Sequence, residues 1–330
     1  MPTIIWNKEE EEILKKYYLQ PNGIEEIQKL TNKTRKQILT KGKYLGFRLV
    51  HFATKDDSFF EVPNIINSYV AGFLAGDGYM RYGQHGSIYL GLTLAQKDIA
   101  HLEIIKNLFK YNGKILFRSI KRSLKLKQGN LYFQFPEKTY YSAAIICTRA
   151  EKWREDIAKN WNFWKDPSAL KKSLTLEPPI NLINNNFKLS YLAGIIDADG
   201  AIMITSDKNH VFKESLKISI VGTEPLNLWI KELHDYYLSY MSTRQIESKP
   251  YTVAKTYHIG GIRAYWLSKI ILSLKLPLLD RKWDNARHFI KRIESEPLSK
   301  QMITKLNNTF SDNLRNFFIE HNIEIPYFIK

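Results

Sequence analysis

Two aspartates end the two copies of a repeated segment. The segment at residues 68–78 (SYVAGFLAGDG) recurs at residues 190–200 (SYLAGIIDADG), with six of eleven residues identical. Each copy has the pattern of a helix that ends in an acid, Asp77 or Asp199. An acid at a helix C-terminus faces the negative end of the macrodipole, which is unfavourable by roughly 0.3–1 kcal/mol, and two such acids brought together repel each other. A divalent cation between the two carboxylates offsets both the helix-dipole cost and their mutual repulsion. The repeat therefore favours a metal site over two unrelated surface aspartates.

A stripe of small residues predicts that the two copies pack on each other. Gly72 and Gly76 lie four residues apart, as do Gly194 and Ala198, so each helix carries small residues along one face. Such faces allow close approach of two backbones. We therefore expect the two helices to bring their terminal acids together. The glycine after each acid is expected in the left-handed conformation that ends many helices (Gly78 and Gly200).

The two motifs resemble those of the LAGLIDADG homing endonucleases in their single-chain form. The copy at residues 192–200 (LAGIIDADG) is close to the family's name, and the copy at residues 70–78 (VAGFLAGDG) is weaker, with Ala75 in the place of Asp197. The resemblance covers residues 60–296. It implies an α+β fold, a pseudo-twofold pair of αββαββα half-domains whose sheets form a DNA-binding saddle. It also implies a site-specific endonuclease that hydrolyses phosphodiester bonds in both strands of double-stranded DNA.

The resemblance implies a metal centre to which both motifs contribute. In that family the penultimate acid of each motif binds the catalytic metal, here Asp77 and Asp199, with the preceding Gly76 and Ala198 expected beside the ion. The expected cofactor is Mg²⁺, for which Mn²⁺ can substitute, whereas Ca²⁺ is expected to bind without turnover. Metal ions held by two carboxylates can activate water, neutralise the phosphorane and assist the leaving oxygen.

Three further catalytic residues follow from the resemblance. The family often keeps a polar residue at the end of the second strand, which is Gln96 here. We place Gly222 at the matching position of the second half, so the two active centres, and hence the cutting rates of the two strands, are expected to be unequal. The family also places a basic residue near the scissile phosphate, and Lys172 and Lys282 are the candidates. Ordinary surface or helix-capping lysines explain these two equally well.

Alternating patterns predict the strands that carry the DNA contacts. In the segment 87–94 every second residue is aliphatic, and residues 98–110 have the pattern of an amphipathic helix with an acid at its start. The segment 118–127 also alternates and places three lysines on one face. Strand ribbons can read base edges in the major groove, although a solvated face is an even alternative for each residue. The expected contacts are Arg81, Tyr89, Lys121, Lys125, Lys127 and Lys217.

The first fifty residues have the pattern of a separate three-helix domain. The third helix is opened by a capping box at residues 34–37, and residues 33–48 contain six basic residues and no acid. Such a pattern is typical of a recognition helix and is similar to Myb-like or helix-turn-helix domains. A small helical cap on the nuclease is the alternative. The expected DNA contacts are Lys33, Arg35, Lys36, Lys41 and Lys43.

These patterns divide the chain into six parts. We expect a helical domain at residues 1–50, a linker at 51–62, a first half-domain at 63–177, a linker at 178–187, a second half-domain at 188–296 and a helical tail at 297–330. The Pro-Pro pair and the asparagine run mark the second linker. The tail shows no pattern that indicates chemistry.

Composition agrees with a nucleic-acid partner. Lys and Arg outnumber Asp and Glu 49 to 33, which gives a net charge of +16 and a pI near 9.5, and such a field attracts polyanions. The single Cys147 excludes an internal disulfide, and no apolar run is long enough for a membrane span. We therefore expect a soluble intracellular monomer with no membrane or protein partner, in the cytoplasm or nucleoid of a bacterial or phage host or in an organelle, and intron-encoded as homing endonucleases are.

Two other functions use the same scaffold. A DNA-binding regulator that does not cut would be indicated by loss of a motif acid, and here both are present. An RNA maturase that assists intron splicing would use the same basic saddle, and the acids do not decide between it and a nuclease. An intein is not expected, because the chain opens with Met-Pro-Thr and does not end in His-Asn.

Overall fold

The computed structural model divides the chain into two compact units, Met1–Phe52 and Ala53–Lys330. It describes residues 6–18, 23–47, 53–83, 87–122, 125–128, 131–134, 137–165, 176–206, 214–238, 246–248 and 255–329. Within these residues no helix is long and apolar enough to cross a membrane.

The smaller unit contains three short helices around a core of its own. They are α1 (Lys8–Tyr17), α2 (Gly23–Thr31) and α3 (Arg35–Tyr44). The side chain of Thr34 accepts a hydrogen bond from the backbone of Gln37, whose side chain bonds back to Thr34, so the capping box is present. Gly46, at φ +79°, ends the third helix in the left-handed conformation. The core consists of Leu14, Tyr18, Ile24, Ile27 and Ile38.

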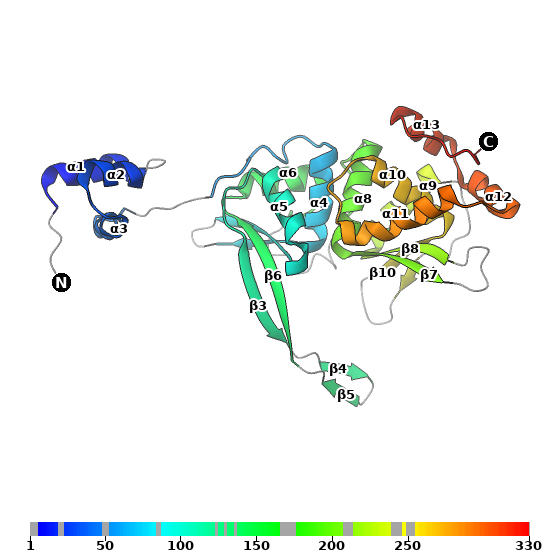
Figure 1. The fold of residues 1–330 in the computed structure, drawn as a ribbon, viewed down its shortest axis with the longest axis horizontal. Helices are drawn as coiled ribbons and strands as arrows, with labels where there is room; N and C mark the ends of the chain where they lie inside the picture. The colour runs from blue at the N-terminus through cyan, green and yellow to red at the C-terminus, as the bar shows by residue number, and fades with distance from the viewer. Residues whose placement is uncertain are drawn as a thin grey trace. The chain divides into compact units, whose positions relative to one another are not determined.

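The larger unit contains two half-domains that share a helix, two strands, a second helix and two further sheet strands, in that order (Figure 1). The first half-domain has an additional two-stranded hairpin, and the second ends in two helices instead of one. The first comprises α4 (Ile65–Asp77), β1 (Gly78–Tyr82), β2 (Ile88–Ala95), the short 3₁₀ turn Gln96–Asp98, α5 (Ile99–Leu108), β3 (Leu116–Arg122), β4 (Lys125–Gln128), β5 (Leu131–Gln134), β6 (Lys138–Cys147) and α6 (Glu151–Trp161). The second comprises α8 (Asn185–Asp199), β7 (Gly200–Ser206), β8 (Glu214–Gly222), α9 (Glu224–Tyr237), β9 (Ile246–Ser248), β10 (Lys255–Gly260), α10 (Ile262–Ser273) and α11 (Asp280–Ser295).

Each half-domain is built on a four-stranded antiparallel sheet. The strand orders are β1-β2-β6-β3 and β7-β8-β10-β9, so corresponding strands occupy corresponding places. The helices cover one face of the sheets (Figure 1). The expected alternation is confirmed in β2, where Ile88, Leu90, Leu92 and Leu94 are all buried against the helices. The expected mixed fold of helices and antiparallel sheets is therefore present.

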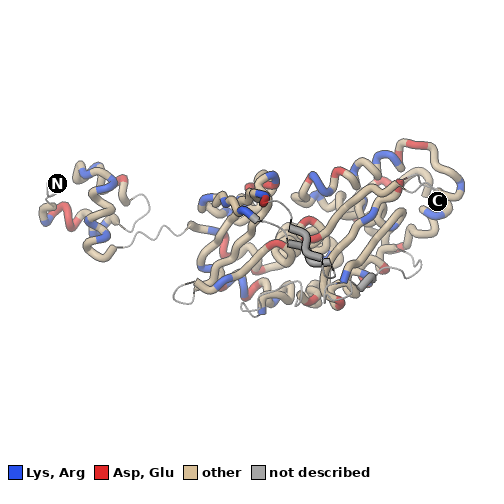
Figure 2. The backbone as a smooth tube through the Cα atoms, turned by 90° about the horizontal axis from the view of Figure 1, so that it is seen from below, with Lys and Arg blue, Asp and Glu red and all other residues tan. Residues whose placement is uncertain are grey.

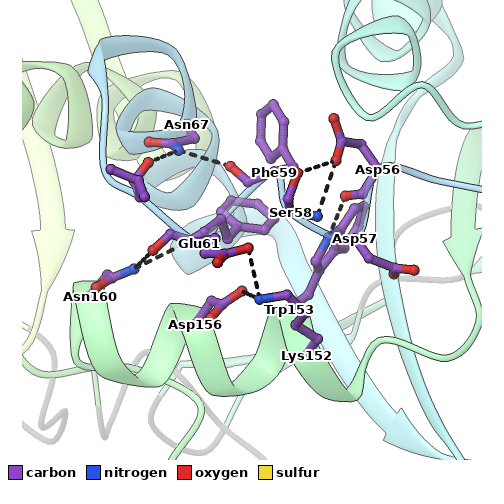
Figure 3. Close-up of polar contacts among 12 residues, drawn as sticks. Asp56, Asp57, Ser58, Phe59, Glu61, Asn67, Lys152, Trp153, Asp156 and Asn160 are labelled. Atoms are coloured by element: carbon purple, nitrogen blue, oxygen red, sulfur yellow. Dashed lines mark hydrogen bonds and ion pairs between the residues drawn. The ribbon is translucent and has the colours of Figure 1, made fainter.

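The segment 51–62, expected to be a linker, is packed onto the larger unit from residue 53 onward. Phe60 is fully buried among the rings of Phe109, Trp153 and Trp161. Polar contacts fasten the same segment: Lys152 on α6 pairs with Glu61, and Trp153 donates its indole N–H to the carbonyl of Asp56 (Figure 3). The charged and small residues of this segment suggest a linker, but its two adjacent phenylalanines supply the apolar surface that attaches it to the core.

The C-terminal tail completes the core of the second half-domain. It forms α12 (Lys300–Thr309) and α13 (Asp312–Glu320), whose Leu314, Phe317 and Phe318 are buried. Phe318 lies edge-on to Trp266 of α10, and Ser311 donates its hydroxyl to the carbonyl of Tyr237. The tail is therefore a structural part of the larger unit.

The two motif helices, α4 and α8, approach each other to backbone contact. A Cβ added at Gly72 would lie 2.0 Å from the carbonyl oxygen of Tyr191, and one added at Gly194 would lie 2.0 Å from that of Tyr69. The two contacts are related by the pseudo-twofold symmetry of the repeat. The expected packing of small-residue faces is therefore confirmed.

The glycines that follow the motif acids do not adopt the expected left-handed conformation. Gly78 has φ −73° and ψ 159°, and Gly200 has φ −87° and ψ 167°, so both are extended. Strands β1 and β7 begin at these residues without an intervening turn. A Cβ would lie 2.6 Å from the carbonyl oxygen of Leu74 in one copy and 2.7 Å from that of Ile196 in the other. Close approach to the last helical turn, rather than positive φ, explains both glycines.

Gly194→Ala is expected to lower the free energy of unfolding by about 1–3 kcal/mol, because the new methyl group meets backbone atoms of α4 that cannot rotate away. Urea unfolding followed by circular dichroism measures the loss. Gly260→Ala is the matched control, since no atom lies within 4 Å of its added Cβ. Equal stability of the two variants would contradict the close packing of the motif helices.

Candidate functional site

The motif acids lie at the adjoining ends of α4 and α8. Asp77 is half-buried and Asp199 is exposed. A Cβ added at Gly76 would lie 2.3 Å from the Cβ of Ala198 and 3.0 Å from Oδ2 of Asp199. The Asp199 carboxylate therefore lies directly against the last turn of the opposite motif helix, as the small-residue stripe predicts.

Lys282, in the first turn of α11, caps the end of α8. Its Nζ donates to the carbonyl oxygens of Ile196, Ala198 and Gly200 at 3.0, 3.0 and 2.8 Å. An ammonium group has three donors, so all of them are used, and its charge offsets the negative end of the α8 dipole. Burial lowers the pKa of Lys282, whereas the carboxylates of nearby aspartates, including Asp77 and Asp199, act in the opposite direction. Lys282 therefore caps the C-terminus of α8, which is the alternative role named for it above. Its role at the scissile phosphate stays a prediction.

Asp197, the extra acid of the second motif, is buried and accepts three hydrogen bonds. The donors are the hydroxyl of Tyr69 at 2.8 Å, the backbone N–H of Leu279 at 2.9 Å and the indole of Trp283 at 2.6 Å. Tyr69 belongs to α4, while Leu279 and Trp283 lie at the start of α11. Burial raises the pKa of Asp197 to about 6 despite these donors. Asp197 therefore joins the first motif helix, the second motif helix and α11.

The network continues to a buried histidine of the first half-domain. The hydroxyl oxygen of Tyr69 lies 3.1 Å from Nε2 of His101 on α5. Because the hydroxyl hydrogen goes to Asp197, the histidine must donate Nε2–H to the tyrosine oxygen. Burial lowers the pKa of His101 to about 4, so the ring is neutral at pH 7. The sequence offered no signal for this residue, because single histidines on apolar helix faces are common.

The corresponding tyrosine of the second copy lacks an acceptor. Tyr191 matches Tyr69, but Ala75 stands where Asp197 would be needed, and the Tyr191 hydroxyl is buried without a hydrogen-bond partner. Tyr191→Phe is therefore expected to leave stability unchanged or raise it, whereas Tyr69→Phe is expected to lower it by about 1–3 kcal/mol. Thermal unfolding of both variants tests this difference. A larger loss in Tyr191→Phe would mean that its hydroxyl is bonded.

Strand register corrects the match between Gln96 and Gly222. Gly78 pairs with Leu92, whereas Gly200 pairs with Ile220, so Leu92 corresponds to Ile220, 128 residues further along. The longer β7–β8 hairpin accounts for the change from the 122-residue spacing of the motifs. Gly222 therefore matches Leu94, and the residue that matches Gln96 is Glu224. Gln96 directly follows β2, and Glu224 follows β8 after the helix-capping Thr223. The two predicted centres would therefore differ by an amide in one and a carboxylate in the other.

The same register shows which strand residues share the face opposite the helices. Arg81 pairs directly with Tyr89, so both lie on that face, and the guanidinium of Arg81 lies 4.9 Å from the ring centre of Tyr79. Lys217 occupies the equivalent face of the second sheet, paired with Met203. Seen from below, Lys and Arg are spread over both half-domains (Figure 2). Arg81, Tyr89 and Lys217 therefore lie on the sheet face that the helices leave uncovered, and their contacts with DNA stay predictions.

Lys121 lies on the other face of the sheet. Phe117 pairs with Ala143, which pairs with the buried Leu94, so Phe117 and, four residues on, Lys121 share the helix-side face. Arg118, which is not among the expected contacts, shares the face of Arg81. The alternation could not reveal this, because both faces of β3 are exposed where the strand runs beyond the helices (Figure 1). The expected single strand at 118–127 is also interrupted, since β3 ends at 122 and β4 begins at 125.

One predicted catalytic residue and two predicted DNA contacts have side chains outside the described part of the structure. Lys172 lies in the segment 166–175, which is outside the described residues, and the side chains of Lys125 and Lys127 are likewise outside them. Their assigned roles stay predictions.

Ion pairs within the smaller unit engage three of its five selected cations. Lys33 pairs with Glu10 at 2.9 Å, and Lys41 pairs with Glu11, and in both pairs the side chains are half-buried. Arg35 pairs with Glu25 at 3.1 Å on the surface. The acids belong to α1 and α2, which the sequence analysis did not relate to α3. Among the described residues of this unit, the selected cations without an ion-pair partner are Lys36 and Lys43.

The donor set fits a metal that keeps much of its own water. In the described part of the chain, no group of three or more His, Cys, Asp or Glu side chains could hold an ion. Asp77 and Asp199 supply carboxylates, and the carbonyl of Ala198 already accepts a hydrogen bond from Lys282. Mg²⁺ commonly binds through one or two carboxylates together with waters and substrate phosphates, which these residues can accommodate.

No protein-family model matches the chain, and no curated protein matches it. Among solved structures, it is similar to the I-LtrWI LAGLIDADG homing endonuclease bound to target DNA, at 12% identity and a TM-score of 0.42 over 83% of this chain and 100% of that chain. It is also similar to meganuclease I-SmaMI bound to uncleavable DNA, at 14% and 0.41 over 79% and 97%, and to LAGLIDADG meganuclease I-AabMI bound to uncleaved DNA, at 15% and 0.40 over 77% and 97%. With TM-scores below 0.5, the activity of this chain must be inferred from its own residues.

Proposed function

We propose that this protein is a site-specific, metal-dependent endonuclease of the LAGLIDADG type that cuts double-stranded DNA. The observation that supports this most directly is the backbone contact between α4 and α8, which places the ends of both motif helices side by side. Two carboxylates at this junction, each followed at once by a sheet strand, suit a centre that acts on a duplex lying along both sheets. The net charge of +16 favours the same polyanionic partner.

Asp77 and Asp199 would hold the divalent metal, with Gly76 and Ala198 beside it. When bound, Mg²⁺ would supply an activated water and neutralise charge developing on the phosphate. Gln96 and its counterpart Glu224 would orient water at the two centres. Lys282 would keep the end of α8 in place and contribute positive charge beside the motif acids.

The exposed faces of the two sheets would bind the duplex, through Arg81, Tyr89, Arg118 and Lys217. The smaller unit would add a second DNA contact through α3, where Lys36 and Lys43 are the available cations. A cap on the nuclease body remains the alternative role for that unit, and binding by the Lys36→Glu/Lys43→Glu variant distinguishes the two.

Cleavage of a randomised duplex library by the purified protein tests the proposal. With Mg²⁺ or Mn²⁺ we expect cuts in both strands at an enriched sequence, and with Ca²⁺ or EDTA we expect none. Binding should persist in Ca²⁺. Tight DNA binding without cutting in either active ion would instead indicate a regulator, and preferential binding of structured intron RNA would indicate a maturase.

A further inference from the structure

One ion pair joins the two half-domains beside the motif acids. Arg281 of α11, in the second half, donates Nε to Oδ1 of Asp98 at 2.6 Å and Nη2 to Oδ2 at 2.8 Å. Asp98 ends the short turn Gln96–Asp98 of the first half. Two parallel hydrogen bonds of this kind fix orientation as well as distance, so the pair sets how these two segments face each other.

Asp98 occupies a position that the pseudo-symmetry assigns to a core residue. The 128-residue match that relates Leu92 to Ile220 also relates Asp98 to Leu226, and both side chains are buried, at 6% and 1% exposure. A carboxylate at a leucine position is unfavourable unless it is paired. Its place at the start of α5 does not explain the carboxylate, because the side chain makes no cap hydrogen bond. Among the described residues, its ion-pair partner is Arg281.

The pair connects two proposed site residues that belong to different halves. Gln96 opens the turn that Asp98 closes, and Lys282 directly follows Arg281 in the chain. The hydrogen bond to the Asp98 carboxylate raises the pKa of Arg281, and the charges of Asp197 and Asp77 act in the same direction. On the other side of α11, Lys282 and Trp283 are bonded to α8.

We infer that Asp98 and Arg281 are positioning residues that hold Gln96 and Lys282 in a fixed relation to the motif acids. This inference rests on the proposed endonuclease function. The first turn of α11 then connects two segments: Lys282 hydrogen-bonds to the end of α8, and Arg281 pairs with Asp98 in the turn after β2. Neither residue needs to touch the DNA, because each acts through its neighbour in the chain.

Replacement of both charged residues by leucine, the residue that the pseudo-symmetry places opposite Asp98, tests this role. Arg281→Leu alone leaves a buried carboxylate unpaired and is expected to be unstable. The Asp98→Leu/Arg281→Leu variant removes both charges and should regain stability, as Leu226 is accommodated in the second half. We expect its melting temperature to be near that of wild type, its DNA affinity in Ca²⁺ to be unchanged, and its single-turnover cleavage rate in Mg²⁺ to be roughly 10- to 100-fold lower.

The control pair lies at the far end of the same helix. Arg292 pairs with Glu214 of β8, within one half-domain, and Arg292→Leu/Glu214→Leu should cut at the wild-type rate. Arg281→Lys keeps the charge but loses the two-bond geometry, and we expect an intermediate rate with normal stability. A folded Asp98→Leu/Arg281→Leu variant that cuts as fast as wild type would overturn the positioning role. Absence of cleavage by wild type itself would instead refute the proposed function.

Discussion

Asp77→Asn and Asp199→Asn are each expected to lower the rate of DNA cleavage in Mg²⁺ by roughly 10³-fold, because a carboxamide cannot replace a charged ligand worth several kcal/mol of transition-state stabilisation. Binding of the selected duplex in Ca²⁺ should weaken much less, since in the proposed complex most of the affinity would come from phosphate contacts on the sheets. Single-turnover cleavage and gel-shift binding, measured on the same duplex, give the two quantities separately.

Asp312→Asn, at the exposed start of α13, is the control for both motif substitutions and should cut at the wild-type rate. The melting temperature of each motif variant, measured beside that of wild type, separates a loss of cleavage from a loss of folding. If one motif variant cut at the wild-type rate, its aspartate would not be a metal ligand. The proposal of a shared centre would then be wrong.

Asp197→Ala is expected to lower the free energy of unfolding by about 3–5 kcal/mol. The substitution leaves the Tyr69 hydroxyl, the Leu279 N–H and the Trp283 indole without their acceptor in a buried site. Because Leu279 and Trp283 flank Lys282, the start of α11 should also loosen and cleavage should slow. Urea unfolding measures the first effect, and a loss below about 1 kcal/mol would show that water replaces the carboxylate.

The same carboxylate predicts how stability varies with pH. Burial raises the pKa of Asp197 from 3.8 to about 6, so between these values the folded protein binds a proton that the unfolded chain has released. The contribution of this group to the free energy of unfolding is therefore complete below about pH 4 and is lost as the pH rises through 6, by about 3 kcal/mol in total. Subtracting the pH profile of Asp197→Asn, which cannot bind that proton, isolates the effect. Parallel profiles would contradict the raised pKa.

Much of the local structure could be predicted from the sequence. The repeat located both motif helices and their terminal acids, and the small residues in it predicted close packing, because a backbone contact requires residues without bulky side chains. Alternation located β2, since one face of that strand is buried. Gln96 could be placed at the end of its strand for the same reason. These features depend on residues within one helix or strand, where the spacing along the sequence determines which face each side chain lies on.

What only the tertiary structure decided involves pairs of segments. The register of β7 against β8 moved the counterpart of Gln96 from Gly222 to Glu224, because hairpin length is free to vary without changing either strand's pattern. The attachment of Phe60 to the core and the donors to Asp197 come from residues 49 to 128 positions away in the chain. The pattern identifies Asp98 only as an acid at the start of a helix, whereas the fold pairs it with Arg281 of the other half-domain. The role of a buried polar residue depends on its hydrogen-bond or ion-pair partner. For these residues the partner lies on a distant segment of the chain, and no local sequence pattern identifies it.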